Sequence, residues 1–182
     1  RDPSVGPGPY LFTISTIEPR KNLGTLFAAF AALKRKDVRL VVAGGKGWLY
    51  ESALARIGEL GIADRVDLLG YVADDRLPGL YGHAEAYVCP SLTEGFGMPV
   101  LEAMLAGTPV VSSDAGALPE VGGNLVRYFS PTDAEGMARA IDDELADEGR
   151  RSRAAKAKLR AAEFTWDRCA DLTLDAIEEA IR

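Results

Sequence analysis

AYVCPSLTEGFGMPVLE, residues 86–102, contains the signals of a strand, a glycine-rich turn and a helix start in one uninterrupted run. Its first four residues are apolar and typical of a strand, which Pro90 ends. Pro99 falls where the first turn of a helix can use its fixed φ angle. The run therefore predicts one strand, turn and helix, and the rest of the chain repeats this unit.

The same alternation of strand and helix extends over most of the chain. Apolar, β-prone segments predict six strands, at residues 10–15, 39–43, 66–69, 86–89, 108–112 and 125–129. Apolar residues at helical spacing separate them, and from residue 133 onward the pattern predicts three helices with breaks at Gly149 and residues 164–166. Near-continuous apolar strands between helices require a parallel sheet that is covered on both faces. We predict an α/β fold, a Rossmann-like doubly wound parallel sheet with C-terminal helices, in one domain (residues 10–182) preceded by a linker or boundary segment (residues 1–9).

The turns after the strands carry the most unusual residues of the chain. In a doubly wound sheet, ligands bind at the carboxyl ends of the strands. The turns that converge on that edge are those after residues 15, 43, 69, 89 and 112. We therefore expect a ligand site at this edge.

Two carboxylates flank the glycine-rich turn, Glu94 before it and Glu102 after it. Exposed backbone N–H groups at the predicted helix start, beside Gly97, would face a phosphate group. Carboxylates are poor phosphate ligands but good acceptors for sugar hydroxyls. The combination predicts a site for a phosphorylated, polyhydroxylated ligand, and specifically for a nucleotide sugar.

The segment Glu18-Pro19-Arg20-Lys21-Asn22 follows the first predicted strand and supplies two cations. Lysine is a compact charge and arginine a bidentate fork, so Arg20 and Lys21 both suit a diphosphate. Asn22 is the expected N-cap of the next helix. A solvated basic turn is the common alternative, but convergence with the Gly97 turn on the same edge favours Lys21 as a ligand.

Other motifs argue against competing chemistries. Gly44-Gly45-Lys46-Gly47 lacks the spacing of a phosphate loop, and no dinucleotide-binding glycine motif follows the first strand, so these glycines suit a sharp turn or a close ligand. His83 is the only histidine and has no ligand-spaced partners, so a metal cluster or a catalytic triad is not expected. Tyr71 and Val72 could border a base, although core or rim positions are commoner for such residues. Gly116 lies in another turn that reaches the same edge.

The composition is that of an ordinary globular domain, with 182 residues of which 47% are apolar and 26% charged. The net charge of −6 argues against a general nucleic-acid or membrane-surface binder. No apolar run approaches transmembrane length, and the spacing of the only cysteines, Cys89 and Cys169, indicates neither a disulfide nor a metal site. We expect a cytoplasmic location. The acidic and basic runs between residues 142 and 160 are interpreted as a solvated helix pair.

Together these motifs resemble the nucleotide-binding half of GT-B glycosyltransferases, in particular the large retaining family 4 typified by bacterial mannosyltransferases. The resemblance spans nearly the whole chain. Residues 94–102 are similar to the Glu-x7-Glu motif of that family. Three further motifs fall in matching order, at residues 18–22, 45–48 and 118–120.

The resemblance implies a role for each matching residue. Lys21 would contact the donor diphosphate and Glu94 the transferred sugar, and these two are the expected catalytic residues. Glu102 would bind the ribose hydroxyls. The other expected donor-binding residues are Arg20, Thr16, Gly45, Tyr71, Val72, Gly97 and Met98. Many members carry an arginine where this chain has Thr16, so either Arg20 supplies the missing charge or fewer cations hold the diphosphate.

The resemblance also implies the reaction and its requirements. Family members need neither a metal nor another cofactor, which agrees with the absence of an Asp-x-Asp pair from this sequence. They transfer a hexose with retention, and the first expectation here is mannose, from GDP-mannose, to a saccharide or lipid-linked acceptor. The alternatives are a non-catalytic nucleotide-binding module and half of a GT-B sugar-nucleotide epimerase.

Full-length members have an amino-terminal acceptor-binding domain, which this chain is expected to lack. The chain alone is therefore expected to bind a nucleotide sugar and to transfer nothing. Its last helix, around residues 166–181, would pack toward that domain and leave apolar surface exposed. Contact with the inner face of a membrane would arise only through the full-length protein.

Overall fold

The computed structural model of the protein describes residues 2–181. Within these residues, one sheet of six parallel strands has the order β3-β2-β1-β4-β5-β6. The strands are β1 (Tyr10–Ile14), β2 (Arg39–Ala43), β3 (Val66–Gly70), β4 (Ala86–Cys89), β5 (Val110–Ser113) and β6 (Arg127–Phe129). Their ends differ from the predicted ones by no more than two residues. The predicted doubly wound parallel sheet is confirmed.

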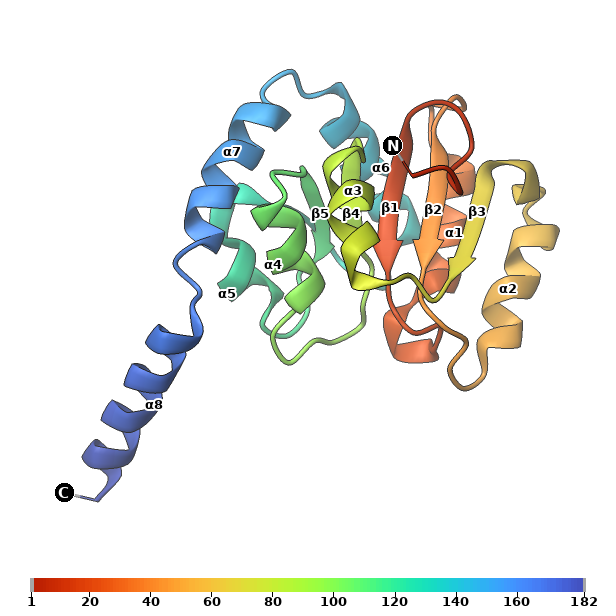
Figure 1. Cartoon of the computed structure of the whole chain (residues 1–182). Helices are drawn as coiled ribbons and strands as arrows, with labels where there is room; N and C mark the ends of the chain where they lie inside the picture. Colours follow the sequence, from red (N-terminus) through yellow and green to blue (C-terminus); the bar gives the residue numbers. More distant parts are fainter. Residues whose placement is uncertain (1, 182) are drawn as a thin grey trace.

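Helices cover both faces of this sheet (Figure 1). They are α1 (Leu23–Ala32), α2 (Tyr50–Glu59), α3 (Leu77–Gly82), α4 (Met98–Leu105), α5 (Leu118–Gly122), α6 (Ala134–Ala146), α7 (Arg150–Ala161) and α8 (Trp166–Ala180). Short 3₁₀ turns occur at Pro19–Lys21, Ala63–Arg65, Asp74–Arg76 and Gly123–Leu125. Helices α1, α2 and α6 pack on one face, and α3, α4, α5 and α7 pack on the other. The three predicted C-terminal helices are present, with breaks at the predicted places.

The central strands β1 and β4 are largely apolar because each face of the sheet has its own core. In β1, Leu11 packs with the α1 and α6 side, while Tyr10 and Phe12 pack with the α3 and α4 side. In β4, Val88 packs with the α1 and α6 side, and Tyr87 packs with the α3 and α4 side. All five side chains are at most 1% exposed, as expected for a parallel sheet that is buried on both faces.

The strand order brings β1 and β4 together although they are far apart in sequence. Leu11 pairs with Ala86 and Phe12 with Tyr87 in parallel register. On one side of this pair the chain runs outward through β2 and β3, and on the other through β5 and β6. The turns that leave β1 and β4 therefore diverge at a switch point, which is where ligands bind in this class of sheet.

Residues 2–9, which form most of the predicted linker, lie against the domain. Asp2 forms an ion pair with Arg76 at 2.7 Å, and the backbone N–H of Gly6 donates to the Asp67 carboxylate. Val5 is buried in the core on the α3 and α4 side. This segment is thus held at several points.

The charged runs between residues 142 and 160 are not simply solvated, and this corrects the prediction. The Glu144 side chain is 1% exposed and accepts hydrogen bonds from Arg127 at 2.9 Å and from Arg153. Arg153 also pairs with Asp147. Since a buried carboxylate requires ionic or hydrogen-bonding partners, these side chains join β6, α6 and α7 internally.

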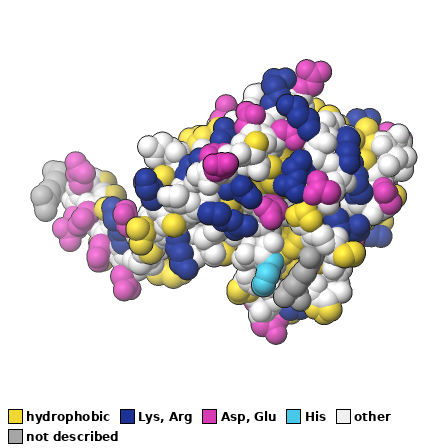
Figure 2. Space-filling model, turned by 90° about the horizontal axis from the view of Figure 1, so that it is seen from above, with side chains coloured by type: hydrophobic (Ala, Val, Ile, Leu, Met, Phe, Trp, Pro, Cys, Tyr) yellow, Lys and Arg dark blue, Asp and Glu magenta, His cyan; other side chains and the backbone are white. Residues whose placement is uncertain are grey.

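Helix α8 projects away from the rest of the domain, at the lower left of Figure 1. Among its described residues none is buried, and the exposed apolar side chains are Trp166, Leu172, Leu174 and Ile177. The exposed apolar surface that was predicted for the last helix is therefore present. Figure 2 shows the mixture of positive and negative side chains on one face of the domain, with α8 as a separate arm. No helix within residues 2–181 is both long and apolar enough to cross a membrane.

Adjacent glycines after β2 offer a matched test of the packing at the carboxyl edge. A Cβ atom on Gly44 (φ 122°) would lie 1.9 Å from the carbonyl oxygen of Ser15, whereas one on Gly45 would meet nothing within 4 Å. Gly44→Ala should lower the free energy of unfolding by roughly 2–4 kcal/mol, because backbone must move. Gly45→Ala should change it by about 0.5 kcal/mol or less. Urea denaturation of both variants measures this, and equal losses would contradict the close approach.

Candidate functional site

The turns after β1 and β4 are joined side by side at the carboxyl edge of the sheet. The backbone N–H of Leu92 donates to the carbonyl of Arg20 at 2.9 Å. The side-chain amide of Asn22 donates to the carbonyls of Pro90 at 2.9 Å and Pro131 at 2.8 Å. These bonds fix the first turn relative to the second, and to the turn after β6.

Asn22 occupies the predicted N-cap position of α1, but its side chain does not cap the helix. Its backbone is left-handed, with φ 58° and ψ 31°, and its Oδ1 accepts a hydrogen bond from the hydroxyl of Thr25 at 2.6 Å. The predicted position is right and the predicted capping bond is wrong. The amide links separate turns instead.

The two predicted catalytic residues are in direct contact. Lys21 Nζ lies 2.6 Å from Glu94 Oε1, with the two side chains 15% and 11% exposed. The hydroxyl of Ser91, which is buried, donates to the same carboxylate oxygen at 2.7 Å. This ion pair is shielded from water more than a surface pair, so it is stronger than one.

Arg20 approaches the other oxygen of the same carboxylate. Its Nη1 lies 3.3 Å from Glu94 Oε2 and 3.3 Å from the carbonyl oxygen of Thr93. Its Nη2 lies 2.9 Å from Glu18 Oε1, and the Arg20 side chain remains 43% exposed. Both cations predicted for the diphosphate therefore lie at one carboxylate, and the guanidinium is open to solvent.

Opposing influences act on the pKa of Glu94. Burial alone raises the pKa of this carboxyl group, but hydrogen bonds from Lys21 and Ser91 and the charges of Lys21 and Arg20 lower it. The net effect holds the pKa below its ordinary value of 4.5. Glu94 is therefore a carboxylate at neutral pH and acts as an acceptor of hydrogen bonds.

The glycine-rich turn ends at Gly97, which is the N-cap of α4 and has φ 98°. A Cβ atom at this position would lie 2.5 Å from the side chain of Leu118, so the turn requires glycine for both conformation and space. Met98 and Pro99 form the first turn of the helix, as predicted, and Met98 is exposed. Pro99 has no N–H, and the N–H of Val100 donates to the carbonyl of Gly97 at 2.9 Å, so the N–H groups at this helix start that remain for an anion are those of Gly97 and Met98.

The turn after β5 is pressed against this site, as predicted for Gly116. A Cβ atom on Gly116 (φ 60°) would lie 2.3 Å from the carbonyl oxygen of Glu94. That oxygen accepts a hydrogen bond from the N–H of Ala117 at 3.1 Å. The backbone of Glu94 is thus held by one turn while its side chain faces another.

Glu102, expected at the ribose, lies one turn into α4 and is partly exposed. The hydroxyl of Tyr81 donates to Glu102 Oε2 at 2.8 Å. Tyr81 lies at the end of α3 and is 2% exposed. Glu102 is therefore a partly exposed carboxylate that is held by a buried tyrosine.

The remaining predicted donor-binding residues follow β1, β2 and β3. Thr16 and Gly45 are both exposed and lie in turns that run side by side, since Ile17 exchanges backbone hydrogen bonds with Gly45 and Gly47. Tyr71 is 80% exposed. The Val72 side chain is 5% exposed and packs in the core on the α3 and α4 side.

Sequence reasoning did not find Ser91 or Tyr81. Ser91 directly follows the strand-ending proline and stands three residues before Glu94, which is a local signal that could have been used. Tyr81 is separated from Glu102 by 21 residues and belongs to an apolar stretch. Nothing in its spacing indicates a polar role.

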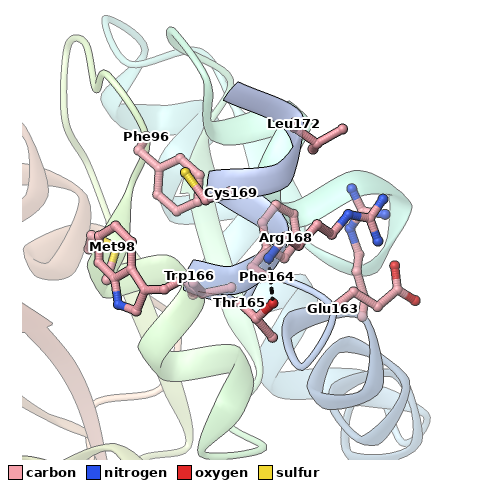
Figure 3. Close-up of a pocket in the computed structure, with 11 residues that line it drawn as sticks. Phe96, Met98, Glu163, Phe164, Thr165, Trp166, Arg168, Cys169 and Leu172 are labelled. Carbon is pink, nitrogen blue, oxygen red and sulfur yellow. Dashed lines mark hydrogen bonds between the residues drawn. The ribbon is translucent and has the colours of Figure 1, made fainter. Parts of the chain in front are cut away.

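An apolar hollow of about 590 Å³ borders the head of α4. Figure 3 shows Phe96 and Met98 of the glycine-rich turn facing Phe164, Trp166 and Cys169, at the start of α8. The rings of Phe96 and Phe164 meet edge to face, with centroids 5.9 Å apart. The junction of α7 and α8 thus adjoins the site.

The acidic, histidine and cysteine side chains of residues 2–181 include no group of three placed to hold a metal ion. His83 is exposed, and its Nδ1 lies 2.8 Å from the carbonyl oxygen of Gly79. Cys89 is buried and Cys169 exposed, and both are free thiols.

Residues 3–160 match the family model described as Glycosyl transferases group 1. The chain belongs to this family. The match includes every predicted site residue and ends before α8.

Several relatives of the chain are named as glycosyltransferases. The O-antigen chain mannosyltransferase B of Escherichia coli is 38% identical over 92% of this chain and 45% of its own length. The serotype-specific mannosyltransferase WbdA of Escherichia coli is 31% identical, over 97% of this chain and 22% of its own length. A D-inositol 3-phosphate glycosyltransferase of Salinispora tropica is 37% identical over 92% of this chain and 38% of its own length. The chain spans less than half the length of these relatives.

Solved structures share the fold. Sucrose-phosphate synthase of Thermosynechococcus elongatus has a TM-score of 0.81 and 27% identity, over 96% of this chain and 46% of that chain. The Anabaena protein Alr3699/HepE, in complex with UDP and glucose, has a TM-score of 0.84 at 24% identity, over 94% of this chain and 48% of that chain. The six-stranded sheet of this chain thus matches the GT-B architecture.

The pKa of Glu94 predicts how stability depends on pH. Because the folded pKa lies below 4.5, the ionised carboxylate stabilises the fold above that pH, and this contribution is lost as the pH falls through the folded value. Glu94→Gln should therefore lower the free energy of unfolding at neutral pH, and its difference from the wild type should shrink as the pH falls through 4.5 and below the folded pKa.

Urea denaturation at several pH values measures that difference. The matched control is Glu148→Gln, which neutralises an exposed carboxylate away from the site and should show a small difference throughout. A constant difference for Glu94→Gln over the same range would contradict the assignment.

Proposed function

We propose that the chain is the donor-binding half of a retaining glycosyltransferase that moves a hexose from a nucleoside-diphosphate sugar to a saccharide or lipid-linked acceptor. Mannose, carried by GDP, is the first candidate, because two of the relatives are named mannosyltransferases. The observation that carries the proposal is the meeting of Lys21, Glu94 and the start of α4 at the switch point of the sheet. A UDP complex of the Anabaena protein with the same fold supports a nucleotide ligand.

In this proposal each group has a distinct task. The N–H groups of the glycine-rich turn and first helical turn, around Gly97, bind the diphosphate, and Lys21 stabilises the charge that develops as the diphosphate leaves. Glu94 accepts hydrogen bonds from the transferred sugar, and Glu102 accepts them from the ribose. Arg20 supplies the second cation in place of an arginine at position 16, since its guanidinium already lies near Glu94.

The proposed transfer uses the diphosphate itself for proton chemistry. The sugar passes through an oxocarbenium-like state, and a phosphate oxygen of the leaving group accepts the proton of the acceptor. Glu94 positions the sugar and does not attack it, because its carboxylate is paired with Lys21 and Ser91. The reaction requires no metal and no other cofactor in this proposal.

We propose that transfer also requires an amino-terminal half, which would supply the acceptor site and close over the donor. Support comes from the length of the relatives, of which this chain covers less than half. The apolar face of α8, with Trp166 and Leu172, suits contact with that half. A nucleotide-binding module without catalysis and half of a sugar-nucleotide epimerase remain the competing functions.

A nucleotide titration tests donor binding. Isothermal titration of the chain in EDTA with GDP, UDP and ADP should show binding of at least one of them in preference to NAD. Lys21→Ala should weaken that binding by about tenfold to a hundredfold, because a charge-assisted contact is lost. The affinity for the corresponding nucleoside monophosphate should fall by a smaller factor in Lys21→Ala, since the monophosphate presents less negative charge to the lysine.

The matched control is Lys34→Ala, which removes an exposed lysine from the turn after α1, at the opposite edge of the sheet. Lys34→Ala should leave the affinities for the nucleoside diphosphate and for the monophosphate unchanged. Equal losses for the diphosphate and the monophosphate on Lys21→Ala would contradict the diphosphate assignment, and thermal melts check that the variants are folded.

The chain alone should transfer no sugar. Incubation with GDP-mannose or UDP-glucose and simple saccharide acceptors should yield no glycoside by mass spectrometry, because the acceptor site and domain closure are proposed to lie in the other half. Detection of a glycoside product from this polypeptide would refute that requirement.

A further inference from the structure

The hydroxyl of Tyr81 connects the core of the domain to the edge of the site. It donates to Glu102 Oε2 at 2.8 Å, from α3 to α4. The other oxygen of Glu102, Oε1, accepts no hydrogen bond from any residue that the structure describes. One carboxylate oxygen is thus tied inward and the other is available.

Tyr81 itself is held firmly. Its ring meets Phe12 edge to face with centroids 5.0 Å apart, and it packs on Tyr87 at 5.4 Å. Its carbonyl accepts a hydrogen bond from the hydroxyl of Thr108 at 2.8 Å. A side chain locked by this packing can fix the position of the group to which its hydroxyl donates.

The hydroxyl also remains a donor over the working pH range. Burial, and secondarily the charge and hydrogen bond of Glu102, raises the pKa of Tyr81 far above its ordinary value of 10. A protonated phenol has one O–H group to donate, and a carboxylate only accepts. The direction of the bond is therefore fixed.

Fixing one oxygen matters for a ligand with two adjacent hydroxyls. A carboxylate oxygen that accepts from two adjacent hydroxyls must be held at one position between them, and a long flexible side chain loses rotamer entropy when it is held there. The bond from Tyr81 orders Glu102 before the ligand arrives. The entropy lost on binding is correspondingly smaller.

We propose that Tyr81 is a positioning residue that sets the preference of this site for ribose over deoxyribose. It does so by orienting the Glu102 carboxylate toward the 2′- and 3′-hydroxyls of the nucleotide. The inference rests on the proposed function, in which Glu102 binds the ribose.

The test is binding of ribonucleotides and deoxyribonucleotides to Tyr81→Phe, which removes the hydroxyl and retains the packed ring. The probes are GDP and UDP, and then the 2′-deoxy and 3′-deoxy forms of the tighter binder. In Tyr81→Phe the ribonucleotide should bind about threefold to tenfold more weakly than to the wild type, because a hydrogen bond to a charged group is lost. Affinity for the deoxy forms should change little, so the ratio of ribonucleotide to deoxynucleotide affinity falls.

The matched control is Tyr10→Phe. Tyr10 belongs to the same core cluster, and its buried hydroxyl donates to the carbonyl of Leu80 at 2.8 Å. It should lower the melting temperature to a similar extent and leave the affinity ratio unchanged. A purely structural role for Tyr81 would make the two variants alike in both measurements.

A second variant separates this inference from the function on which it depends. If Glu102→Gln lowers the affinity ratio and Tyr81→Phe leaves it at the wild-type value, the positioning role is overturned while the ribose assignment stands. If Glu102→Gln also retains the wild-type ratio, the ribose assignment fails and the inference fails with it. A lower affinity ratio in both Glu102→Gln and Tyr81→Phe, with the wild-type ratio retained in Tyr10→Phe, supports both the ribose assignment and the positioning role.

Discussion

Two carbonyl oxygens from separate turns, those of Pro90 and Pro131, accept hydrogen bonds from the side-chain amide of Asn22. Asparagine suits this place because it tolerates a left-handed backbone and carries two donors on one nitrogen. The strand order alone brings the turns after β1 and β4 to the same edge, but it does not fix their separation. The amide does so together with the hydrogen bond from the N–H of Leu92 to the carbonyl of Arg20, and these bonds hold the turns that bring Lys21 to Glu94.

Electrostatic balance at this edge distinguishes it from a simple basic patch. Glu18, Arg20, Lys21 and Glu94 form a connected cluster whose formal charges cancel. In the proposed complex, attraction for a diphosphate must therefore come largely from the backbone N–H groups at the head of α4. The paired carboxylates keep the cations in place and provide acceptors for hydroxyl groups. A site of this kind favours a ligand that is both anionic and polyhydroxylated.

Much of the fold could be predicted because it rests on short-range patterns. Apolar strands between helices fix a parallel sheet, and its carboxyl edge gathers the turns that hold Lys21, Glu94 and Gly97. The pairing of Tyr81 with Glu102 could not be predicted, since it depends on how α3 and α4 pack. The burial of Glu144 depends in the same way on arginines from other elements. Local periodicity carries no information about such long-range polar contacts.

The segment after β4 is anchored almost residue by residue. The carbonyl of Ser91 accepts from the Ser113 hydroxyl, the N–H of Leu92 bonds to Arg20, and the carbonyl of Glu94 bonds to Ala117. These anchors belong to two neighbouring segments, the turn after β1 and the end of β5 with the turn that follows it, so one inserted or deleted residue would break several of them at once. Among the loops of this edge, this one should therefore keep a constant length across related sequences, while length variation accumulates in turns with fewer such bonds.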